Sequence, residues 1–328
     1  MDQGGVRLTV GWDGMRIVGA RVECRRPQAA RLLVGRPIAE ALALAPRLFS
    51  LCGGAQGAAA RMAAAAAQGE TISLDALRRD VVLETIGEHL WRLLLDWPQL
   101  LGGVPEKEVF LTWRKRLMAA QAPAETGRLV AELREWLVGR ALPEGVDELA
   151  ASVSALLLPW RNAEEWAVAG VDESFAQMPT LAGQAAETGV LARQAGAPLV
   201  ADLLAAGQRV AARIAARHVE LDFLARGLLA PDLLTGWLDA SPLAEGAGLA
   251  RVETARGLLL HLIQVKDGRV AAYVIVAPTE WNFHPQGAFV GEIVGSPAAT
   301  RDEAEMLARR LALALDPCVN YEVVVENA

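Results

Sequence analysis

Residues 253–282 read ETARGLLLHLIQVKDGRVAAYVIVAPTEWN, and this stretch decides the expected fold. Residues 258–265 and 270–277 are two strand-like apolar runs on either side of the tetrapeptide KDGR. An Asp-Gly turn between such runs is a strong signal for a β-hairpin. Because both runs are apolar at most positions, we expect the hairpin to be covered on both faces.

A second β-hairpin is predicted at the N-terminus. Residues 6–12 alternate between apolar and other side chains, and Asp13-Gly14 supplies a tight turn. Apolar residues at Met15, Ile17 and Val22 continue the pattern after the turn. Period-two alternation around an Asp-Gly pair is typical of two antiparallel strands with one buried face.

Between these hairpins the sequence is patterned as helix. The period is helical over residues 37–68, where a glycine-containing patch at 52–57 interrupts it, and again from 74 to about 234. Residues 199–229 are expected to form the clearest long helix, because their apolar side chains recur at helical spacing. The charged residues that accompany this spacing are Arg209, Arg213, Arg217 and Glu220.

These patterns predict an α+β fold that is mainly α, with a helical body and small β-hairpins contributed by both chain ends. Because the sequence shows no repeats and no long linker, residues 1–328 are expected to form a single domain. It would comprise an N-terminal hairpin (1–36), a helical body (37–250) and a C-terminal hairpin, loop and helix (251–328). The last helix is predicted at residues 302–315, before a short apolar tail.

The composition argues against several classes of partner and location. The net charge of −7 does not favour nucleic acid, which would require a basic stripe. No uninterrupted apolar stretch approaches the roughly 20 residues of a membrane span. The N-terminus also lacks the basic and apolar regions of an export signal. We therefore expect a cytoplasmic protein without a membrane span.

Two of the three cysteines are candidates for chemistry. Cys52 lies between an apolar helix and the glycine-rich start of the next, where the backbone can approach a ligand and a helix N-terminus favours a thiolate. Cys318 follows Pro317 in a fixed turn after the last helix. Cys24 has no companion signal, and there is no Cys-x-x-Cys pair. Composition alone favours ordinary buried thiols at both candidate positions.

The histidines show no pair at metal-ligand spacing. His89 and His218 lie on predicted helices and are expected at the surface or as caps, whereas His261 is expected to be a satisfied core residue of a strand. A zinc site remains an alternative; its ligands would be Cys52, Cys318, His261 and His284. The motifs for phosphate loops, dinucleotide folds and serine hydrolases are absent from the sequence.

Four segments, taken in order, resemble the large subunit of nickel–iron hydrogenases. Leu51-Cys52-Gly53-Gly54-Ala55 is similar to the family's Arg-x-Cys-Gly-x-Cys, and Glu253-Thr254-Ala255-Arg256-Gly257 to its Glu-Ala-Pro-Arg-Gly. Pro278-Thr279-Glu280-Trp281-Asn282 resembles Pro-Thr-Thr-Trp-Asn. Asp316-Pro317-Cys318 resembles the start of Asp-Pro-Cys-x-x-Cys-x-x-His. The resemblance covers both ends of the chain, and residues 74–249 carry no family motif.

The resemblance implies a defective metal centre. In the family, four thiolates hold nickel, and the second cysteine of each pair also bridges to an iron that carries carbon monoxide and two cyanides. Cys52 and Cys318 match the first cysteine of each pair, but Ala55 and Tyr321 stand at the second positions and Val324 at the C-terminal histidine. Alanine and tyrosine cannot replace thiolates that bridge soft metals. We therefore expect no nickel and no enzyme activity.

The residues that would surround the diatomic ligands are better retained. Arg256 and Thr279 match the family's hydrogen-bond donors to the cyanides, and Pro278 belongs to the same motif. A guanidinium and a hydroxyl suit an anionic acceptor. The alternatives are a surface ion pair of Arg256 with Glu253 or Glu292, and a simple turn role for Thr279.

This combination resembles the HupK/HoxV-type accessory proteins of hydrogenase maturation. The resemblance implies a non-catalytic scaffold that receives the Fe(CN)2(CO) unit from maturation proteins and passes it to the apo large subunit. Its metal ligands would be Cys52 and Cys318, and its diatomic-ligand pocket Arg256, Pro278 and Thr279. The alternative is a metal-free assembly chaperone that mimics the large subunit in order to bind maturation factors or hydrogenase subunits.

Overall fold

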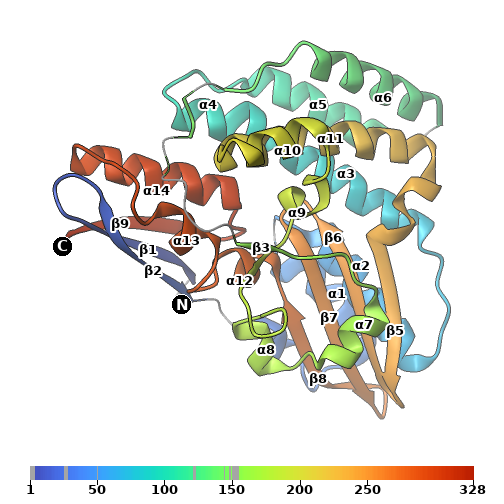
Figure 1. Ribbon diagram of the computed structural model, residues 1–328. Helices are drawn as coiled ribbons and strands as arrows, with labels where there is room; N and C mark the ends of the chain where they lie inside the picture. Colours follow the sequence, from blue (N-terminus) through green and yellow to red (C-terminus); the bar gives the residue numbers. More distant parts are fainter. Residues whose placement is uncertain are drawn as a thin grey trace.

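A computed structural model describes residues 4–25, 29–49, 51–120, 123–143, 145–147, 149 and 155–328 of this chain. Two main β-sheets lie beneath and beside a layer of helices (Figure 1). Residues 1–3, on which the expectation about an export signal partly depends, lie outside the described residues. Among the helices of the described ranges, none is both long and apolar enough to cross a membrane.

The three-stranded sheet joins the two ends of the chain. Strands β1 (Gly5–Trp12) and β2 (Ile17–Arg25) form the predicted antiparallel hairpin, which is confirmed. On the other side of β1, β9 (Tyr321–Asn327) pairs in parallel. Helix α14 (Arg301–Leu315) packs against this sheet and confirms the predicted last helix (Figure 1). The predicted apolar tail is therefore a strand. It adds a third strand to the sheet that the N-terminal hairpin begins.

The four-stranded antiparallel sheet has the order β5-β6-β7-β8. Strands β7 (Gly257–Lys266) and β8 (Arg269–Val276) confirm the predicted C-terminal hairpin. The expectation that the helical body extends to residue 250 is wrong, because β5 (Leu238–Ala244) and β6 (Ala247–Thr254) already belong to this sheet. The sequence signal for these two strands was weak. Strand β5 contains a proline, and β6 is buried at most positions, so it does not show the alternation of buried and exposed residues that marks a strand.

Helices cover both faces of this sheet, as expected for the hairpin. Helices α1 (Ile38–Leu48) and α2 (Gly53–Gln68) lie on one face, and α7 (Ala163–Ala169) and α8 (Glu173–Gln177) on the other (Figure 1). The alanines of α2 allow an unusually close approach to β6: a Cβ at Gly248 would lie only 2.4 Å from the backbone oxygen of Ala63. Helix α1 ends at Leu48 and the glycine patch begins α2 at Gly53, which confirms the predicted glycine-rich start of a helix next to Cys52.

A layer of longer helices packs beyond the sheet. Helix α3 (Asp75–Trp91) runs through a π-helical turn (Arg92–Asp96) into α4 (Trp97–Leu100). Pro98 does not break this helix. Proline has no backbone N–H to donate to the carbonyl of Leu94, and that carbonyl accepts instead from the backbone N–H of Glu106. Helices α5 (Lys107–Ala119) and α6 (Pro123–Val138) complete the layer with α11 (Arg209–Leu229).

The long helix predicted at residues 199–229 is two helices. Helix α10 (Pro198–Ala205) ends before Gly207, whose φ of +75° leaves the helical region, and α11 (Arg209–Leu229) follows. The remaining short elements are the 3₁₀ helices Ala29–Leu32 and Pro231–Trp237, the strands β3 (Leu156–Leu157) and β4 (Ala186–Glu187), and the helices α9 (Val190–Gln194), α12 (Pro278–Asn282) and α13 (Ala288–Ile293).

Candidate functional site

The matched segments from both ends of the chain meet at one place. Cys52 occupies the N-cap position of α2, Arg256 lies in the turn between β6 and β7, and Pro278 and Thr279 are buried in the first turn of α12. The Thr279 hydroxyl lies 3.0 Å from Cys318 Sγ and accepts from the Cys318 backbone N–H at 3.3 Å. Arg256 interacts electrostatically with both thiols. The structure thus brings all five predicted site residues together.

Two glycines allow the chain to approach closely around Cys52. A Cβ at Gly53 would lie 2.8 Å from the carbonyl oxygen of Pro46, and one at Gly54 would lie 2.8 Å from Glu84 Oε2. The Glu84 carboxylate can therefore accept hydrogen bonds from the backbone N–H groups of Gly54 at 2.7 Å and Ala55 at 2.9 Å. An acidic side chain is stabilising at such a helix N-terminus, so α2 begins at a fixed position beside the thiol.

The expectation that the helix N-terminus favours a thiolate at Cys52 is wrong, because the pKa of this thiol is raised and the thiol is protonated. Burial, followed by the neighbouring Cys318, raises the pKa of Cys52 to about 12, although Arg256 opposes the shift. A thiolate is the form that binds metal. Binding of a metal ion at Cys52 therefore has to displace a proton, which makes the site a weak one for any metal that does not favour sulfur strongly.

Arg256 is not at the surface. Its side chain is 6% exposed and forms ion pairs with Glu88 at 2.5 Å and Asp316 at 3.3 Å. The alternative of a surface ion pair with Glu253 or Glu292 is therefore wrong, because both carboxylates bind other arginines. Burial alone would lower the pKa of Arg256, but the two carboxylates that face it outweigh burial and raise that pKa.

Two glutamates of α3 belong to the site and were not predicted. Glu84 and Glu88 are one helical turn apart and both face the region of Cys52 and Arg256. Burial raises the pKa of Glu88 to about 7, even though Arg256 lowers it. The signal that could have found them is a pair of acids at i and i+4 on a helix that also carries apolar residues at helical spacing.

Asp316 connects the C-terminal cysteine to three arginines. It ends α14 with a φ of +58°, a conformation that aspartate tolerates better than most residues. Its carboxylate accepts from Arg92 at 2.8 Å and pairs with Arg217 at 3.1 Å, in addition to Arg256. Burial would raise the pKa of Asp316, but the three guanidinium groups outweigh burial and hold it well below its usual value. The ionised carboxylate thus fixes the turn that carries Cys318.

A buried chain of polar contacts continues from Arg217. Its Nη1 lies 3.3 Å from His89 Nδ1, whose ring Nε2 lies 2.9 Å from the Glu220 carboxylate, which in turn pairs with Arg193 at 2.6 Å. The expectation that His89 lies at the surface or caps a helix is wrong, because its side chain is fully buried between α3 and α11. The charges of α11 likewise do not form a solvated face, because Arg213, Arg217 and Glu220 are all buried.

The other histidines do not form a metal site. His261 is a satisfied core residue, as predicted: its Nδ1 lies 2.8 Å from the Tyr273 hydroxyl and its Nε2 2.9 Å from Gln56 Oε1. Burial lowers the pKa of His261 to about 3. Within the described ranges, no three His, Cys, Asp or Glu side chains are placed to hold a metal ion together, which disfavours the zinc alternative. Half-buried His218 places Nδ1 3.0 Å from the carbonyl oxygen of Ile214.

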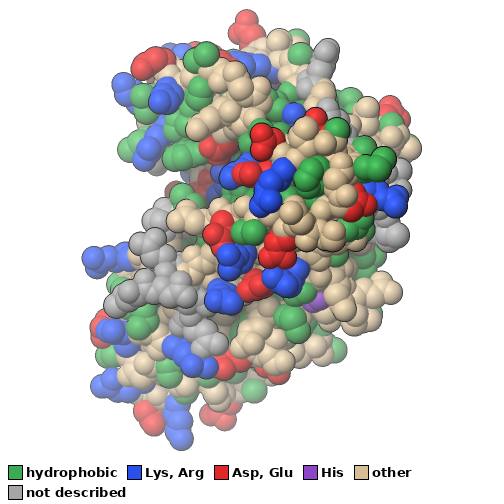
Figure 2. All heavy atoms as spheres, turned by 90° about the vertical axis from the view of Figure 1, so that its left-hand side faces the viewer, with side chains coloured by type: hydrophobic (Ala, Val, Ile, Leu, Met, Phe, Trp, Pro, Cys, Tyr) green, Lys and Arg blue, Asp and Glu red, His purple; other side chains and the backbone are tan. Residues whose placement is uncertain are grey.

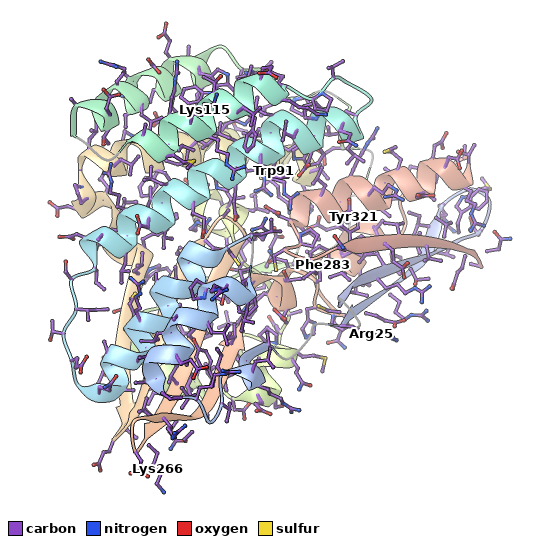
Figure 3. All side chains as sticks on the ribbon, turned by 180° about the vertical axis from the view of Figure 1, so that it is seen from behind. Arg25, Trp91, Lys115, Lys266, Phe283 and Tyr321 are labelled. Atoms are coloured by element: carbon purple, nitrogen blue, oxygen red, sulfur yellow. The ribbon has the colours of Figure 1, made fainter. Side chains whose placement is uncertain are left out.

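The positions that lack family ligands are occupied by structural residues. Ala55 is fully buried in the first turn of α2. Tyr321 begins β9 and pairs with Val6, and Val324 lies within the same strand opposite Thr9. Figure 3 shows Tyr321 at the end of its strand nearest the helical layer. The site therefore offers two thiols where a complete centre would need four.

A cavity connects this site to the surface. Its volume is about 470 Å³, and its lining includes Glu88 and Arg256 as well as the apolar residues Leu51, Trp91 and Met118. These three side chains are exposed, and Figure 3 shows Trp91 on α3. The space-filling view shows that the molecule is hollowed between the helical layer and the part below it (Figure 2). A small ligand therefore has a route to Arg256.

Solved structures identify the fold, and a family model matches part of the chain. The family model described as nickel-dependent hydrogenase matches residues 232–323. The [NiFeSe] hydrogenase from Desulfovibrio vulgaris Hildenborough superposes with a TM-score of 0.68 at 16% identity, over 93% of this chain and 94% of that chain. The fold is that of the nickel–iron hydrogenase large subunit, as the sequence motifs predicted.

Curated relatives define the family within this class. The chain is 34% identical to the hydrogenase expression/formation protein HupK of Rhizobium leguminosarum bv. viciae, over 94% of this chain and 92% of that protein. It is 33% identical to the hydrogenase expression/formation protein HoxV of Cupriavidus necator, over 91% of each chain. The chain belongs to the HupK/HoxV family of hydrogenase expression/formation proteins.

Proposed function

We propose that this protein is a non-catalytic scaffold in the maturation of nickel–iron hydrogenase. It would hold an iron atom that carries two cyanides and one carbon monoxide, and pass it to the apo large subunit. The relatives' names point to a role in hydrogenase formation. The observation that carries the finer proposal is that the half-buried Cys52 and Cys318 converge with the buried Arg256 and Thr279, without the second thiol of either pair.

The donors of the site suit the iron unit. Soft thiolates bind iron with diatomic ligands well, and the metal's own charge would displace the thiol protons. Among the described residues, no acceptor completes a hydrogen bond with Arg256 Nε, although Asp316 lies 3.3 Å from it. A buried donor without an acceptor is costly, so a cyanide nitrogen at this position would be stabilised. The Thr279 hydroxyl, now 3.0 Å from Cys318 Sγ, would orient the second thiolate.

Transfer follows from the ligands that are missing. Cys52 and Cys318 match the cysteines that contact only nickel in the family, and Ala55 and Tyr321 replace the two that bridge to iron. This site therefore holds the iron unit less firmly than a complete large subunit, so the equilibrium favours the acceptor. Because Ala55 and Tyr321 provide no bridging thiolate, nickel has no complete site here and the protein does not turn over hydrogen. The cavity of about 470 Å³ beside Arg256 would be the route by which the unit enters and leaves.

The partners follow from the same role. Maturation proteins that build the iron unit would deliver it, and the apo large subunit would receive it, with the whole process in the cytoplasm. Either protein would bind at the mouth of the cavity. The exposed apolar side chains there are Leu51, Trp91 and Met118.

Infrared spectroscopy of protein purified without oxygen tests this proposal. Cyanide and carbonyl stretching bands should be present in the wild type and lost in Cys52→Ser and Cys318→Ser. Cys24→Ser is the matched control, because Cys24 lies in β2 and lines a different cavity, and should keep the bands. Bands that are absent throughout, together with intact binding of maturation proteins, would instead support the metal-free chaperone.

A further inference from the structure

A second cavity, of about 360 Å³, lies apart from the thiol site. It is formed where α7, α9, β6 and the 3₁₀ helix Pro231–Trp237 meet, on the face of the four-stranded sheet that α7 covers. Its lining includes three tryptophans, Trp160, Trp166 and Trp237, but none of the residues assigned to the iron unit. Its volume lies within the range of about 300 to 1,000 Å³ typical of sites for small molecules.

Three hydrogen-bond donors of this cavity are unused. Within the described part of the chain, Trp166 Nε1, Trp237 Nε1 and Arg251 Nε are buried and meet no acceptor. The side chains that carry them are 1%, 5% and 1% exposed, respectively. In contrast, Trp160 Nε1 donates to the carbonyl oxygen of Gly236 at 3.1 Å. Buried donors are normally paired, so three unpaired donors around one cavity indicate an acceptor that is supplied from outside.

The charge of the lining is positive. Arg161, Arg193 and Arg251 line the cavity, and Glu253 is the carboxylate among its lining residues. Glu253 is already shared, because it pairs with Arg193 at 2.7 Å and also with Arg251. Arg193 also pairs with Glu220 at 2.6 Å, so three guanidinium groups face two carboxylates. An excess of one positive charge remains, which favours an anion.

The aromatic rings do not form a cage for a cation. An arginine already lies over each ring: Arg251 over Trp160 at 5.3 Å, Arg161 over Trp166 at 5.6 Å and Arg193 over Trp237 at 5.0 Å. The attraction of these rings for a positive charge is therefore already used. Their remaining surface offers flat apolar contact to a planar ligand.

We propose that this cavity binds a small organic anion with a flat aromatic body. The indoles would contact the body, and Arg161, the Nε of Arg251 and the free indole N–H groups would bind its carboxylate or phosphate. A guanidinium recognises both anions with the same planar pair of donors. A nucleoside monophosphate and an aromatic carboxylate share this chemistry, and the experiment separates them.

Isothermal titration calorimetry of the purified full chain provides the test, with two pairs of probes. Adenosine monophosphate is compared with adenosine, and indole-3-acetate with indole-3-acetamide. The anion of at least one pair should bind at least about tenfold more tightly than its neutral partner, as a charge-assisted hydrogen bond implies. The pair that shows the difference identifies the source of the anion. Equal affinities within both pairs, or no binding by any probe, would overturn the proposal.

Variants locate the binding in this cavity. Arg161→Gln should remove the preference for the anion, and Trp160→Leu should weaken both members of the pair. Both residues are accessible to solvent and are expected to be replaced without loss of folding. The matched controls are Arg140→Gln and Trp136→Leu, because Arg140 lies over Trp136 at 4.4 Å outside the cavity. Unchanged preference in Arg161→Gln, or equal losses in the control pair, would refute the assignment.

Discussion

Replacement of Asp316 by asparagine should destabilise the fold strongly. The carboxylate is 3% exposed and faces Arg92, Arg217 and Arg256, so its removal leaves buried guanidinium groups without a neutralising charge. Loss of one partner of a buried ion pair costs about 3–5 kcal/mol. Asparagine keeps the size and one acceptor oxygen, so the lost charge is the main change. Such a loss is a large part of the roughly 5–15 kcal/mol by which native domains are stable.

Urea denaturation followed by circular dichroism measures this effect. The matched control is Asp222→Asn, because Asp222 also pairs with two arginines, Arg134 at 2.7 Å and Arg226 at 2.9 Å, but is 35% exposed. Exposed pairs contribute about 0–1 kcal/mol, so the control should lose little. Equal, small losses in the free energy of unfolding of the two variants would refute the view that Asp316 neutralises a buried cluster.

The same pair of variants has a predicted pH dependence. The pKa of Asp316 is lowered in the fold, so its contribution to stability is fully present above the ordinary value of 3.8 and is lost as the pH falls below it. The difference between wild type and Asp316→Asn should therefore be constant from pH 5 to 7 and shrink below about pH 4. A difference that grows on acidification would contradict the assigned ionisation state.

Three further predictions concern single side chains. Arg256→Lys keeps the charge but loses the planar pair of donors, so less iron unit should be retained and the infrared bands should weaken at least about tenfold. Bands of undiminished intensity would show that Arg256 does not bind the diatomic ligands. Thr279→Val should weaken iron retention whereas Thr279→Ser should preserve it, and equal behaviour of the two would show that the hydroxyl, 3.0 Å from Cys318 Sγ, has no positioning role. His261 is buried with a pKa lowered to about 3, so the unfolded state takes up a proton that the fold excludes, and stability is lost as the pH falls from 6.5 towards 3. In His261→Gln this acid loss should be smaller by about 1–3 kcal/mol at pH 4.5 in urea denaturation, and an identical pH profile would contradict the burial of a neutral ring.

The sequence could predict those parts of the fold whose signals are local. Asp-Gly turns between apolar runs define the hairpins β1–β2 and β7–β8, and helical spacing defines α14. The meeting of Cys52, Cys318, Arg256 and Thr279 was also predictable, because a family resemblance supplied the long-range pairing that spacing cannot. The parallel pairing of β9 with β1 carries no local signal, since it joins segments about 300 residues apart.

The buried charges could not be predicted, because their burial depends on partners from distant segments. Arg213 and Arg217 recur at the spacing of a solvated helix face, and nothing nearby in sequence marks them as buried. Arg213 is neutralised by Glu187 and Glu292, and Arg217 pairs with Asp316. Each of these carboxylates lies more than 20 residues away, so only the folded chain shows which face of α11 is the inner one.

The scaffold role itself is tested most directly by following the iron unit from this protein to its acceptor. The protein is loaded with ¹³C-labelled cyanide, freed of unbound material and mixed with unlabelled apo large subunit, and the two proteins are then separated for infrared spectroscopy. If the scaffold role is correct, the labelled cyanide bands leave this protein and appear in the large subunit, and Cys318→Ser supplies none. Labelled bands that stay with this protein, or a large subunit that gains none, would contradict it.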